Sequence, residues 1–413
     1  MEDIIVGIDI GTTKVCTLIG RIDKTGQLQV LGKGFTPFNG VKKGVIVDIE
    51  DTSKAIRFSK EEAEDSASLN FSSAYINIYG THVNVLNHKE SINISSENQV
   101  ITSDDLNRLY DAIEMLPIPE GSQIIDIVPR EYIIDGYGGI LDPIGMSGLT
   151  LEIDVDVVTG KLTSVQNIIR SVEKAGLEVD GLIIEAFATS EISLSPEEKE
   201  IGVILIDVGG GITDVSAFKN GKLIMSDSIP VGGDHITNDI SIGLNISYSE
   251  ADKIKRQYEL ALTTLIKNDQ EVSIYDIKEE KQKNVQVSQI VEIIEARVFE
   301  ILSLAKNLVE KYENIDEFNS GIVLTGGGIS YVNGNKQIGK DIFNLPVRVA
   351  SYRSIIGASK PEMATAAGII KHVSRRNKHS SISTGAREVQ AENRNKFRGF
   401  FSKLVKVIRE WFF

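Results

Sequence analysis

A short motif, an apolar segment that ends in Asp-x-Gly, occurs twice in this chain of 413 residues. The first copy is Ile8-Asp9-Ile10-Gly11, and the second, 198 residues later, is Ile206-Asp207-Val208-Gly209. Each copy leads into small residues and then into another apolar segment, which we expect to form a returning strand. A repeat at this distance predicts two similar domains that face one another, because solenoid repeats have periods of about 20–50 residues. The length agrees, since it exceeds what one hydrophobic core usually serves.

Composition excludes several classes of protein. Hydrophobic residues make up 41% of the chain and charged residues 25%, as in ordinary soluble, folded proteins. No apolar stretch reaches the roughly 18 residues that a membrane-spanning helix needs, and Glu2, Asp3 and Asp9 argue against a secretory signal peptide. Cys16 is the only cysteine, which excludes disulfides and thiolate metal sites and favours a reducing cytoplasm.

The net charge is unevenly distributed along the chain. Residues 371–413 contain eleven basic and three acidic residues, so this tail is at +8. The whole chain is at −14, and the remaining body is therefore at −22. An acidic body argues against nucleic acid as a partner, because phosphate backbones require basic surfaces. The basic tail needs a separate explanation.

Three strand-to-glycine loops indicate the chemistry. The two Asp-x-Gly turns lead into Gly11-Thr12-Thr13 and Gly209-Gly210-Gly211, and an apolar strand at 322–324 leads into Thr325-Gly326-Gly327-Gly328. Small residues let backbone N–H groups approach phosphate oxygens closely. Mg²⁺ prefers oxygen ligands and keeps several waters, so the aspartate of each copy is suited to hold it through its hydration shell. The alternative is that these loops are only tight turns with capping aspartates; a P-loop motif is absent from the sequence.

These motifs resemble those of the actin-like ATPase superfamily and, within it, the bacterial cell-division family FtsA. The resemblance rests on the three loops, on Val231-Gly232-Gly233-Asp234-His235-Ile236-Thr237, and on two connecting segments at 182–188 and 361–368. It covers roughly residues 1–372 and resumes in the last 20. It implies an α/β class and the actin-like two-domain ATPase fold, with duplicated ribonuclease-H-like cores and an inserted small α+β subdomain. It also implies ATP and Mg²⁺ as cofactors, with at most slow ATPase activity.

The resemblance assigns roles to individual residues. The first two loops would grip phosphates, the third would lie against adenosine, and Gly232 and Gly233 would lie near the sugar and phosphates. Related ATPases flank the adenine with a Glu-x-x-Lys pair, whose spacing Glu250 and Lys253 match. Glu185 falls where some relatives orient the attacking water, with helix capping as the alternative, and Lys14 faces either a phosphate or solvent. The candidate catalytic residues are Glu185 and Asp207, the candidate Mg²⁺ ligands through water are Asp9 and Asp207, and the candidate nucleotide contacts are Asp9, Gly11, Thr12, Thr13, Lys14, Asp207, Gly209, Gly210, Gly211, Thr213, Gly232, Gly233, Glu250, Lys253, Gly326, Gly327 and Gly328.

With the resemblance, the chain divides into several units. We expect a first actin-like core (1–83 and 165–190), the inserted α+β subdomain (84–164), a second actin-like domain (191–372, with an outer subdomain at about 234–312), a flexible linker (373–395) and a C-terminal helix (396–413). Locally, 201–208 reads as a strand. Tyr248-Ser249-Glu250 begins a helix to about residue 265, and a longer helix spans about 287–312.

The last 18 residues predict an amphipathic helix. Aromatic and aliphatic residues recur at steps of three and four, and basic residues lie around the other side. A helix of this kind binds in the interface of an anionic membrane; the alternative is a helix that docks on the protein's own core. The candidate membrane contacts are Phe397, Phe400, Phe401, Leu404, Lys403, Lys406, Ile408, Arg409, Trp411 and Phe412.

The resemblance also implies partners and a location. It points to an ATP-binding cell-division protein that polymerises through its inserted module and tethers FtsZ filaments to the inner face of the cytoplasmic membrane at the division site. FtsZ would bind around residues 240–310, where Arg297 and Glu300 are candidate exposed positions. Other division proteins, anionic lipid and further copies of the chain are expected partners. The alternatives are a sugar or acetate kinase of the same superfamily, which would need a pocket with a general base, and an actin-like pilus-assembly adaptor, which usually lacks such a terminal helix.

Overall fold

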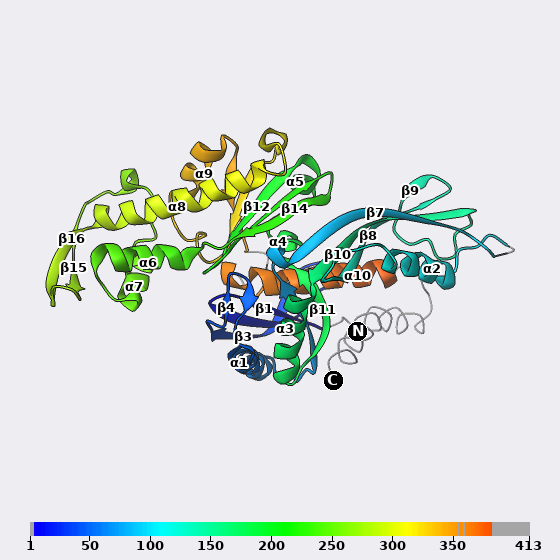
Figure 1. The fold of residues 1–413 in the computed structure, drawn as a ribbon, viewed down its shortest axis with the longest axis horizontal. Helices are drawn as coiled ribbons and strands as arrows, with labels where there is room; N and C mark the ends of the chain where they lie inside the picture. The colour runs from blue at the N-terminus through cyan, green and yellow to red at the C-terminus, as the bar shows by residue number, and fades with distance from the viewer. Residues whose placement is uncertain (1–3, 97, 353–354, 358–359, 382–413) are drawn as a thin grey trace.

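The computed structural model describes residues 4–96, 98–352, 355–357 and 360–381. These residues form two α/β lobes and a smaller α+β module that is inserted in the first lobe (Figure 1). The predicted C-terminal helix at 396–413 lies outside the described residues. No helix in the described ranges is both long enough and apolar enough to cross a membrane.

The sheet of the first lobe has the order β11-β6-β1-β2-β3. Its strands are Glu178–Ile184 (β11), Ser73–Ile78 (β6), Ile5–Ile10 (β1), Lys14–Ile22 (β2) and Leu28–Pro37 (β3). Every residue of β1 is buried, because this central strand is covered on both faces. The helices α1 (Ile49–Ala67) and α3 (Leu162–Lys174) cover one face, and α10 (Ala364–Ser381) covers the other (Figure 1). Since β1, β6 and β11 run parallel, their carboxyl ends lie at one edge of the sheet.

The second lobe repeats this arrangement. Its sheet has the order β14-β13-β12-β17-β18, with strands Lys222–Ile229, Thr213–Lys219, Val203–Val208, Ile322–Thr325 and Val347–Val349. Like β1, β12 pairs antiparallel with the strand that follows it and parallel with a strand on its other side. The outer part contains α6 (Gly233–Leu244), α7 (Tyr248–Tyr258), the hairpin β15–β16 (Glu271–Asp276 and Lys281–Gln286), α8 (Val287–Glu310) and α9 (Asn335–Phe343). The predicted duplication is confirmed.

Two helices connect the lobes. They are α4 (Glu185–Ser193), which follows β11, and α10, and they pack against each other between the two sheets (Figure 1). Their backbones touch, because a Cβ added to Gly368 would lie 1.9 Å from the carbonyl oxygen of Ala188. The small residues of the 361–368 segment therefore permit close helix packing.

The inserted module is an antiparallel sheet with one covering helix. Its strands are β7 (Val83–Asn93), β10 (Thr150–Lys161), β8 (Ser122–Ile134) and β9 (Tyr137–Ile140), in that order, and α2 (Ser103–Glu114) packs against them over a separate apolar core. Among the described residues, two ion pairs join the module to its surroundings. Arg376 of α10 binds the buried Asp126 at 2.7 Å, and Lys222 of β14 lies 3.2 Å from Asp154.

Three predicted element ends are wrong. The helix that begins at Tyr248 ends at Tyr258, not near residue 265, because Glu259 adopts a left-handed conformation (φ 37°) at its end. The strand expected from 201 begins at Val203, because residues before it form the short helix α5 (Pro196–Ile201).

The third difference concerns the linker expected at 373–395. Its first residues continue α10 to Ser381, and the part beyond lies outside the described residues. The helix continues because Arg376 has a buried partner, Asp126, which is 250 residues away in the sequence.

Candidate nucleotide site

The two Asp-x-Gly copies form the same turn. In the first lobe the backbone N–H of Gly11 donates to the carbonyl oxygen of Lys14 at 2.8 Å. In the second lobe the backbone N–H of Gly209 donates to the carbonyl oxygen of Ile212 at 2.9 Å. Both turns follow the central parallel strand of their sheet, the position at which α/β proteins bind ligands.

The two loops contact each other between the lobes. The backbone N–H of Gly211 donates to Thr12 Oγ1 at 2.8 Å, although the residues are 199 positions apart. A side chain at Gly210 would not fit, because its Cβ would lie 2.3 Å from Thr13 Cγ2 in the opposite lobe. The loops of the two lobes therefore meet through small residues.

The third loop and the start of α6 are built on the second loop. The backbone N–H of Gly328 donates to the carbonyl oxygen of Val208 at 2.8 Å, and that of Gly233 donates to the carbonyl oxygen of Gly209 at 2.9 Å. The hydroxyl of Thr213, a predicted nucleotide contact, donates to the carbonyl oxygen of Val231 at 2.7 Å within the sheet. The predicted glycine segments at 209–211, 232–233 and 326–328 are thus brought together.

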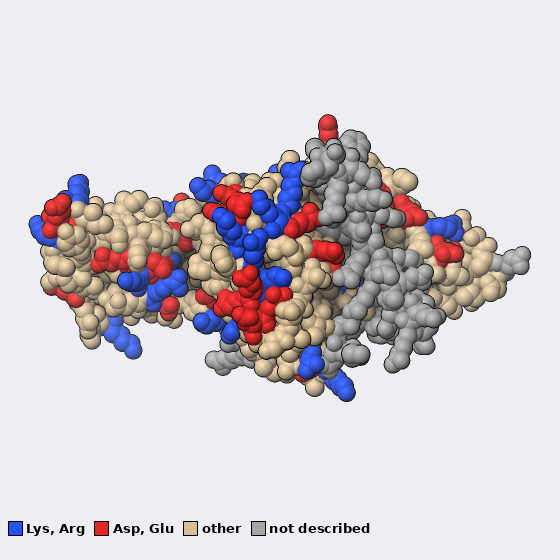
Figure 2. All heavy atoms as spheres, turned by 90° about the horizontal axis from the view of Figure 1, so that it is seen from below, with Lys and Arg blue, Asp and Glu red and all other residues tan. Residues whose placement is uncertain are grey.

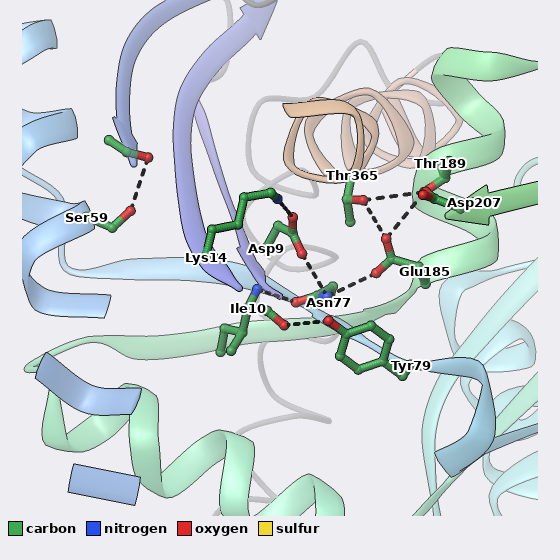
Figure 3. Close-up of polar contacts among 11 residues, drawn as sticks. Asp9, Ile10, Lys14, Ser59, Asn77, Tyr79, Glu185, Thr189, Asp207 and Thr365 are labelled. Carbon is green, nitrogen blue, oxygen red and sulfur yellow. Dashed lines mark hydrogen bonds and ion pairs between the residues drawn. The ribbon is translucent and has the colours of Figure 1, made fainter. Parts of the chain in front are cut away.

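Four carboxylates lie behind these loops: Asp9, Glu185, Asp207 and Asp214. Burial raises the pKa of Glu185 well above its ordinary value, and the negative charge of Asp9 raises it further. Burial and the charge of Asp9 also raise the pKa of Asp207 to about 6, and burial raises the pKa of Asp214 to about 7. Lys14 Nζ contacts Asp9 Oδ2 at 2.5 Å (Figure 3). Burial acts to lower the pKa of Lys14, but neighbouring anionic groups, Asp9 first, outweigh it and raise that pKa.

This donor set fits a hydrated divalent cation. Carboxylate oxygens are the ligands that Mg²⁺ prefers, and a positive ion would offset the repulsion among the four side chains. No group of three or more His, Cys, Asp or Glu side chains that could hold a metal ion is found within the described residues. The contacts with Mg²⁺ that the sequence predicts for Asp9 and Asp207 would instead run through water.

The structure also places the two residues whose roles the sequence left open. Glu185 is the first residue of α4, and its carboxylate accepts hydrogen bonds from Asn77 Nδ2 at 3.0 Å and from the hydroxyl of Thr365 (Figure 3). It faces the other carboxylates, and no side-chain hydrogen bond caps α4. Lys14 faces Asp9 and is mostly buried.

The adenine side of the site differs in detail from the expectation. Glu250 and Lys253 both lie on α7, where Lys253 is exposed to solvent. Lys255, two residues further on, reaches the start of α6, and its Nζ donates to Thr237 Oγ1 at 2.7 Å and to the carbonyl oxygen of Gly233 at 3.0 Å. The basic side chain nearest the predicted loops on this helix is therefore Lys255.

Sequence reasoning missed four residues of this site: Asn77, Thr189, Thr365 and Lys255. Thr189 Oγ1 lies 3.3 Å from Asp207 Oδ2 and thereby joins α4 to the second lobe. One signal was available for Asn77, because it lies near the carboxyl end of a buried apolar strand that runs parallel to β1. The two threonines and Lys255 carry no motif of their own, so only the packing of helices brings them here.

Comparison with known proteins identifies the family. The model of the family "Cell division protein FtsA" matches residues 204–368, and the model of the "SHS2 domain inserted in FTSA" matches residues 80–159, which form the inserted module. The chain is 34% identical to the cell division protein FtsA of Pseudomonas aeruginosa over 372 residues, which cover 89% of this chain and 88% of the relative. The chain belongs to the FtsA family. Relatives include FtsA of Bacillus subtilis (34% identity, 91% and 84% covered) and of Borreliella burgdorferi (30% identity, 100% of both).

Solved structures show that this family member has an actin-like fold. A PilM–PilN type IV pilus biogenesis complex matches with a TM-score of 0.59 at 14% identity, and covers 90% of this chain and 98% of the other. MreB5 of Spiroplasma citri, bound to ADP, matches with a TM-score of 0.54 at 16% identity, and covers 92% and 99%. At these identities the likeness concerns the fold. The expected α/β class, actin-like fold and inserted subdomain are confirmed.

Proposed function

We propose that this FtsA-family protein binds ATP with Mg²⁺ between its lobes. The observation that carries the proposal is the pair of equivalent glycine loops, joined by the Gly211–Thr12 hydrogen bond, with carboxylates behind them. Backbone N–H groups in such loops bind phosphates, and carboxylates attract a divalent cation. The ADP in the MreB5 structure supports a nucleotide as the ligand of this fold.

Residues of both lobes would share the nucleotide. The loops at 11–13 and 209–211 would bind the phosphates, and Asp9 and Asp207 would hold Mg²⁺ through water. Mg²⁺ would supply neutralisation of the phosphate charge. The loop at 326–328, with Gly232 and Gly233, would contact adenosine, and α7 would flank the adenine with Glu250 and Lys253, joined by Lys255.

We propose that Glu185 orients a water molecule, and we expect slow turnover. Its carboxylate lies behind the loops and accepts hydrogen bonds from groups on two other elements. Burial and the charge of Asp9 raise the pKa of Glu185 well above its ordinary value, and we propose that the side chain serves to orient the water rather than to make hydrolysis fast. The nucleotide would therefore act chiefly by setting the conformation of the lobes.

The protein would use this conformation to tether FtsZ filaments to the membrane. The amphipathic segment 396–413 would lie in the inner leaflet of the cytoplasmic membrane at the division site, and the inserted module would contact neighbouring copies in a polymer. On the face seen in Figure 2, basic and acidic side chains intermingle across the middle of the molecule. The strongly basic segment of the chain is the tail, which favours the tail as the contact with anionic lipid.

FtsZ would bind the outer part of the second lobe, around residues 240–310. Of the two positions suggested there, Glu300 is exposed on α8, whereas Arg297 is half-buried and binds Asp239 at 2.5 Å. Arg297 is therefore less free to contact a partner than the sequence suggests. Family membership argues against the sugar or acetate kinase and the pilus-assembly adaptor as alternatives.

Co-sedimentation with anionic liposomes tests the tether. The full chain should pellet with liposomes and carry FtsZ with it in the presence of Mg·ATP. Removal of residues 395–413, or Trp411→Glu, should leave both proteins in the supernatant, because the apolar face is lost or carries a charge. Trp411→Phe keeps the apolar bulk and should still pellet. Undiminished pelleting without residues 395–413 would place the membrane contact elsewhere in the protein.

A further inference from the structure

Asn77 occupies a distinctive place in the first lobe. β1 and β6 pair in parallel with Ile8 opposite Ile76, so the next residues, Asp9 and Asn77, are neighbours at the carboxyl edge of the sheet. β11 pairs with the other side of β6 in parallel, with Ile184 opposite Ile78, and Glu185 follows at the same edge. The strand order alone therefore places an amide between two carboxylates.

The side chain of Asn77 binds both carboxylates at once. Its Nδ2 donates to Asp9 Oδ1 at 3.1 Å and to Glu185 Oε2 at 3.0 Å, and the side chain is 2% exposed (Figure 3). Its Oδ1 accepts the backbone N–H of Ile10 at 2.7 Å, which fixes which end of the amide faces the carboxylates. Both amide hydrogens and the oxygen are thus used, and Ile10 is the residue just before the first glycine loop.

An amide is well suited to this position. Two carboxylates in a buried site repel each other, and a neutral group with two N–H bonds can bind one oxygen of each. An apolar side chain there would leave both carboxylates without this donor, which is costly in a buried site. Thr365 holds the second oxygen of Glu185 from α10, and Lys14 holds the second oxygen of Asp9. Each carboxylate is therefore held from two sides.

We propose that Asn77 is the positioning residue that presents Asp9 to nucleotide-bound Mg²⁺ and holds Glu185 apart from it. The inference rests on the proposed function, since it concerns the same nucleotide site. Without the amide, the Asp9 carboxylate would turn fully toward Lys14, and the hydration shell of Mg²⁺ would lose an acceptor. Asn77 itself touches neither nucleotide nor metal in this account, and acts through the two carboxylates.

The test compares ATP affinity with Mg²⁺ and with EDTA in the full-length protein, by titration with a fluorescent ATP analogue. In the wild-type protein Mg²⁺ should tighten binding. The gain is the ratio of the Kd in EDTA to the Kd in Mg²⁺. In Asn77→Ala this ratio should fall about tenfold, while the Kd in EDTA stays near that of the wild type. Asn77→Ser is smaller than asparagine but, unlike alanine, keeps one hydroxyl donor, so it should show a smaller loss. Ser59→Ala, which removes a buried hydrogen bond to Thr17 elsewhere in the same lobe, should keep the wild-type gain.

Three results would overturn the inference. If Asn77→Ala and Asn77→Ser keep the full gain from Mg²⁺, Asn77 has no positioning role, while the ATP site itself stands. If Asn77→Ala weakens binding equally with Mg²⁺ and with EDTA, and thermal unfolding shows a folded protein, Asn77 only supports the shape of the loop. If the wild-type protein binds no ATP under either condition, the proposed function fails, and the inference fails with it.

Discussion

His372 is a buried histidine that no proposed function uses. It lies on the inner face of α10, 2% exposed, and its ring stacks on that of Phe187 with the ring centres 5.6 Å apart. Neither ring nitrogen has a hydrogen-bond partner among the described residues. Burial lowers the pKa of His372 well below its ordinary value, and the cations Arg376, Arg375 and Lys199 lower it further. The folded protein therefore keeps this ring neutral.

We predict that this histidine makes the protein sensitive to acid. In the unfolded chain a histidine gains a proton near pH 6.5, whereas in the folded protein His372 resists protonation to a lower pH. The unfolded state thus binds more protons below about pH 6.5, so the free energy of unfolding should fall as the pH decreases from 7 to 5. His372→Phe keeps the stack on Phe187 and removes the titration.

Thermal unfolding at pH 7 and pH 5 measures this effect. The drop in Tm between the two values should be smaller in His372→Phe than in the wild-type protein. His88→Phe is the control, at a surface position that pairs with Glu90. Its drop in Tm between pH 7 and pH 5 should not be smaller than that of the wild-type protein. Equal drops in the wild-type protein and His372→Phe would mean that other groups cause the acid sensitivity.

Among the elements, α10 contacts both the candidate nucleotide site and the inserted module. Near its first residue, Thr365 contacts Glu185 in the nucleotide site, and three turns later Arg376 binds Asp126 in the inserted module. Arg376 also donates to the carbonyl oxygen of Ile127 at 3.2 Å. Burial raises the pKa of Asp126, although the charge of Arg376 opposes this. One helix therefore carries contacts to both places.

We predict that the Arg376–Asp126 pair is important for stability. Arg376→Ala would leave the buried Asp126 without its cation, which typically costs about 3–5 kcal/mol. The double variant Arg376→Ala/Asp126→Asn should regain part of the lost stability, because the uncompensated charge of Asp126 is gone. Arg256→Ala, which removes an exposed pair with Asp252, should change stability by less than about 1 kcal/mol. Urea unfolding measures all four proteins; a loss in Arg376→Ala no larger than in Arg256→Ala would contradict the prediction.

The sequence predicted helices and strands better where neighbouring residues in the chain determine them than where tertiary contacts do. The two Asp-x-Gly copies predicted the duplicated lobes, and the helix predicted at about 287–312 is observed as α8, Val287–Glu310. The end of α7 could not be foreseen, because Glu259 adopts its left-handed conformation without a glycine. Likewise, the continuation of α10 depends on Asp126, and the Asn77 contacts depend on strand order. These features come from tertiary packing, which a local pattern does not record.

For the whole molecule, the contact between the two glycine loops determines how closely the lobes approach. They meet at the Gly211–Thr12 hydrogen bond, and Gly210 lies against Thr13 without room for a side chain. A ligand that binds both loops would favour the folded, closed protein over the unfolded chain. At a concentration one hundred times its Kd, such a ligand adds about 2.7 kcal/mol to the free energy of unfolding.

We predict that Mg·ATP raises the Tm of the wild-type protein, and that Gly210→Ala reduces this rise by at least half. The added methyl group would collide with Thr13 and hold the loops apart. Gly138→Ala, where the atom nearest the added Cβ is the flexible end of Glu131 at 3.0 Å, is the matched control and should keep the full rise. Differential scanning fluorimetry with and without Mg·ATP provides the measurement. An undiminished rise in Gly210→Ala would mean that closure of the loops is not needed for binding.

The backbone contact between α4 and α10 also limits how the lobes can move. Gly368 lets the backbone of α10 lie directly against the carbonyl oxygen of Ala188, so the two helices cannot move closer together at this point. Separation of α4 from α10 would break that contact and the apolar packing around it. A rotation of one sheet against the other about this helix crossing would preserve both, so we expect the lobes to open and close by rotation rather than by separation of the two helices.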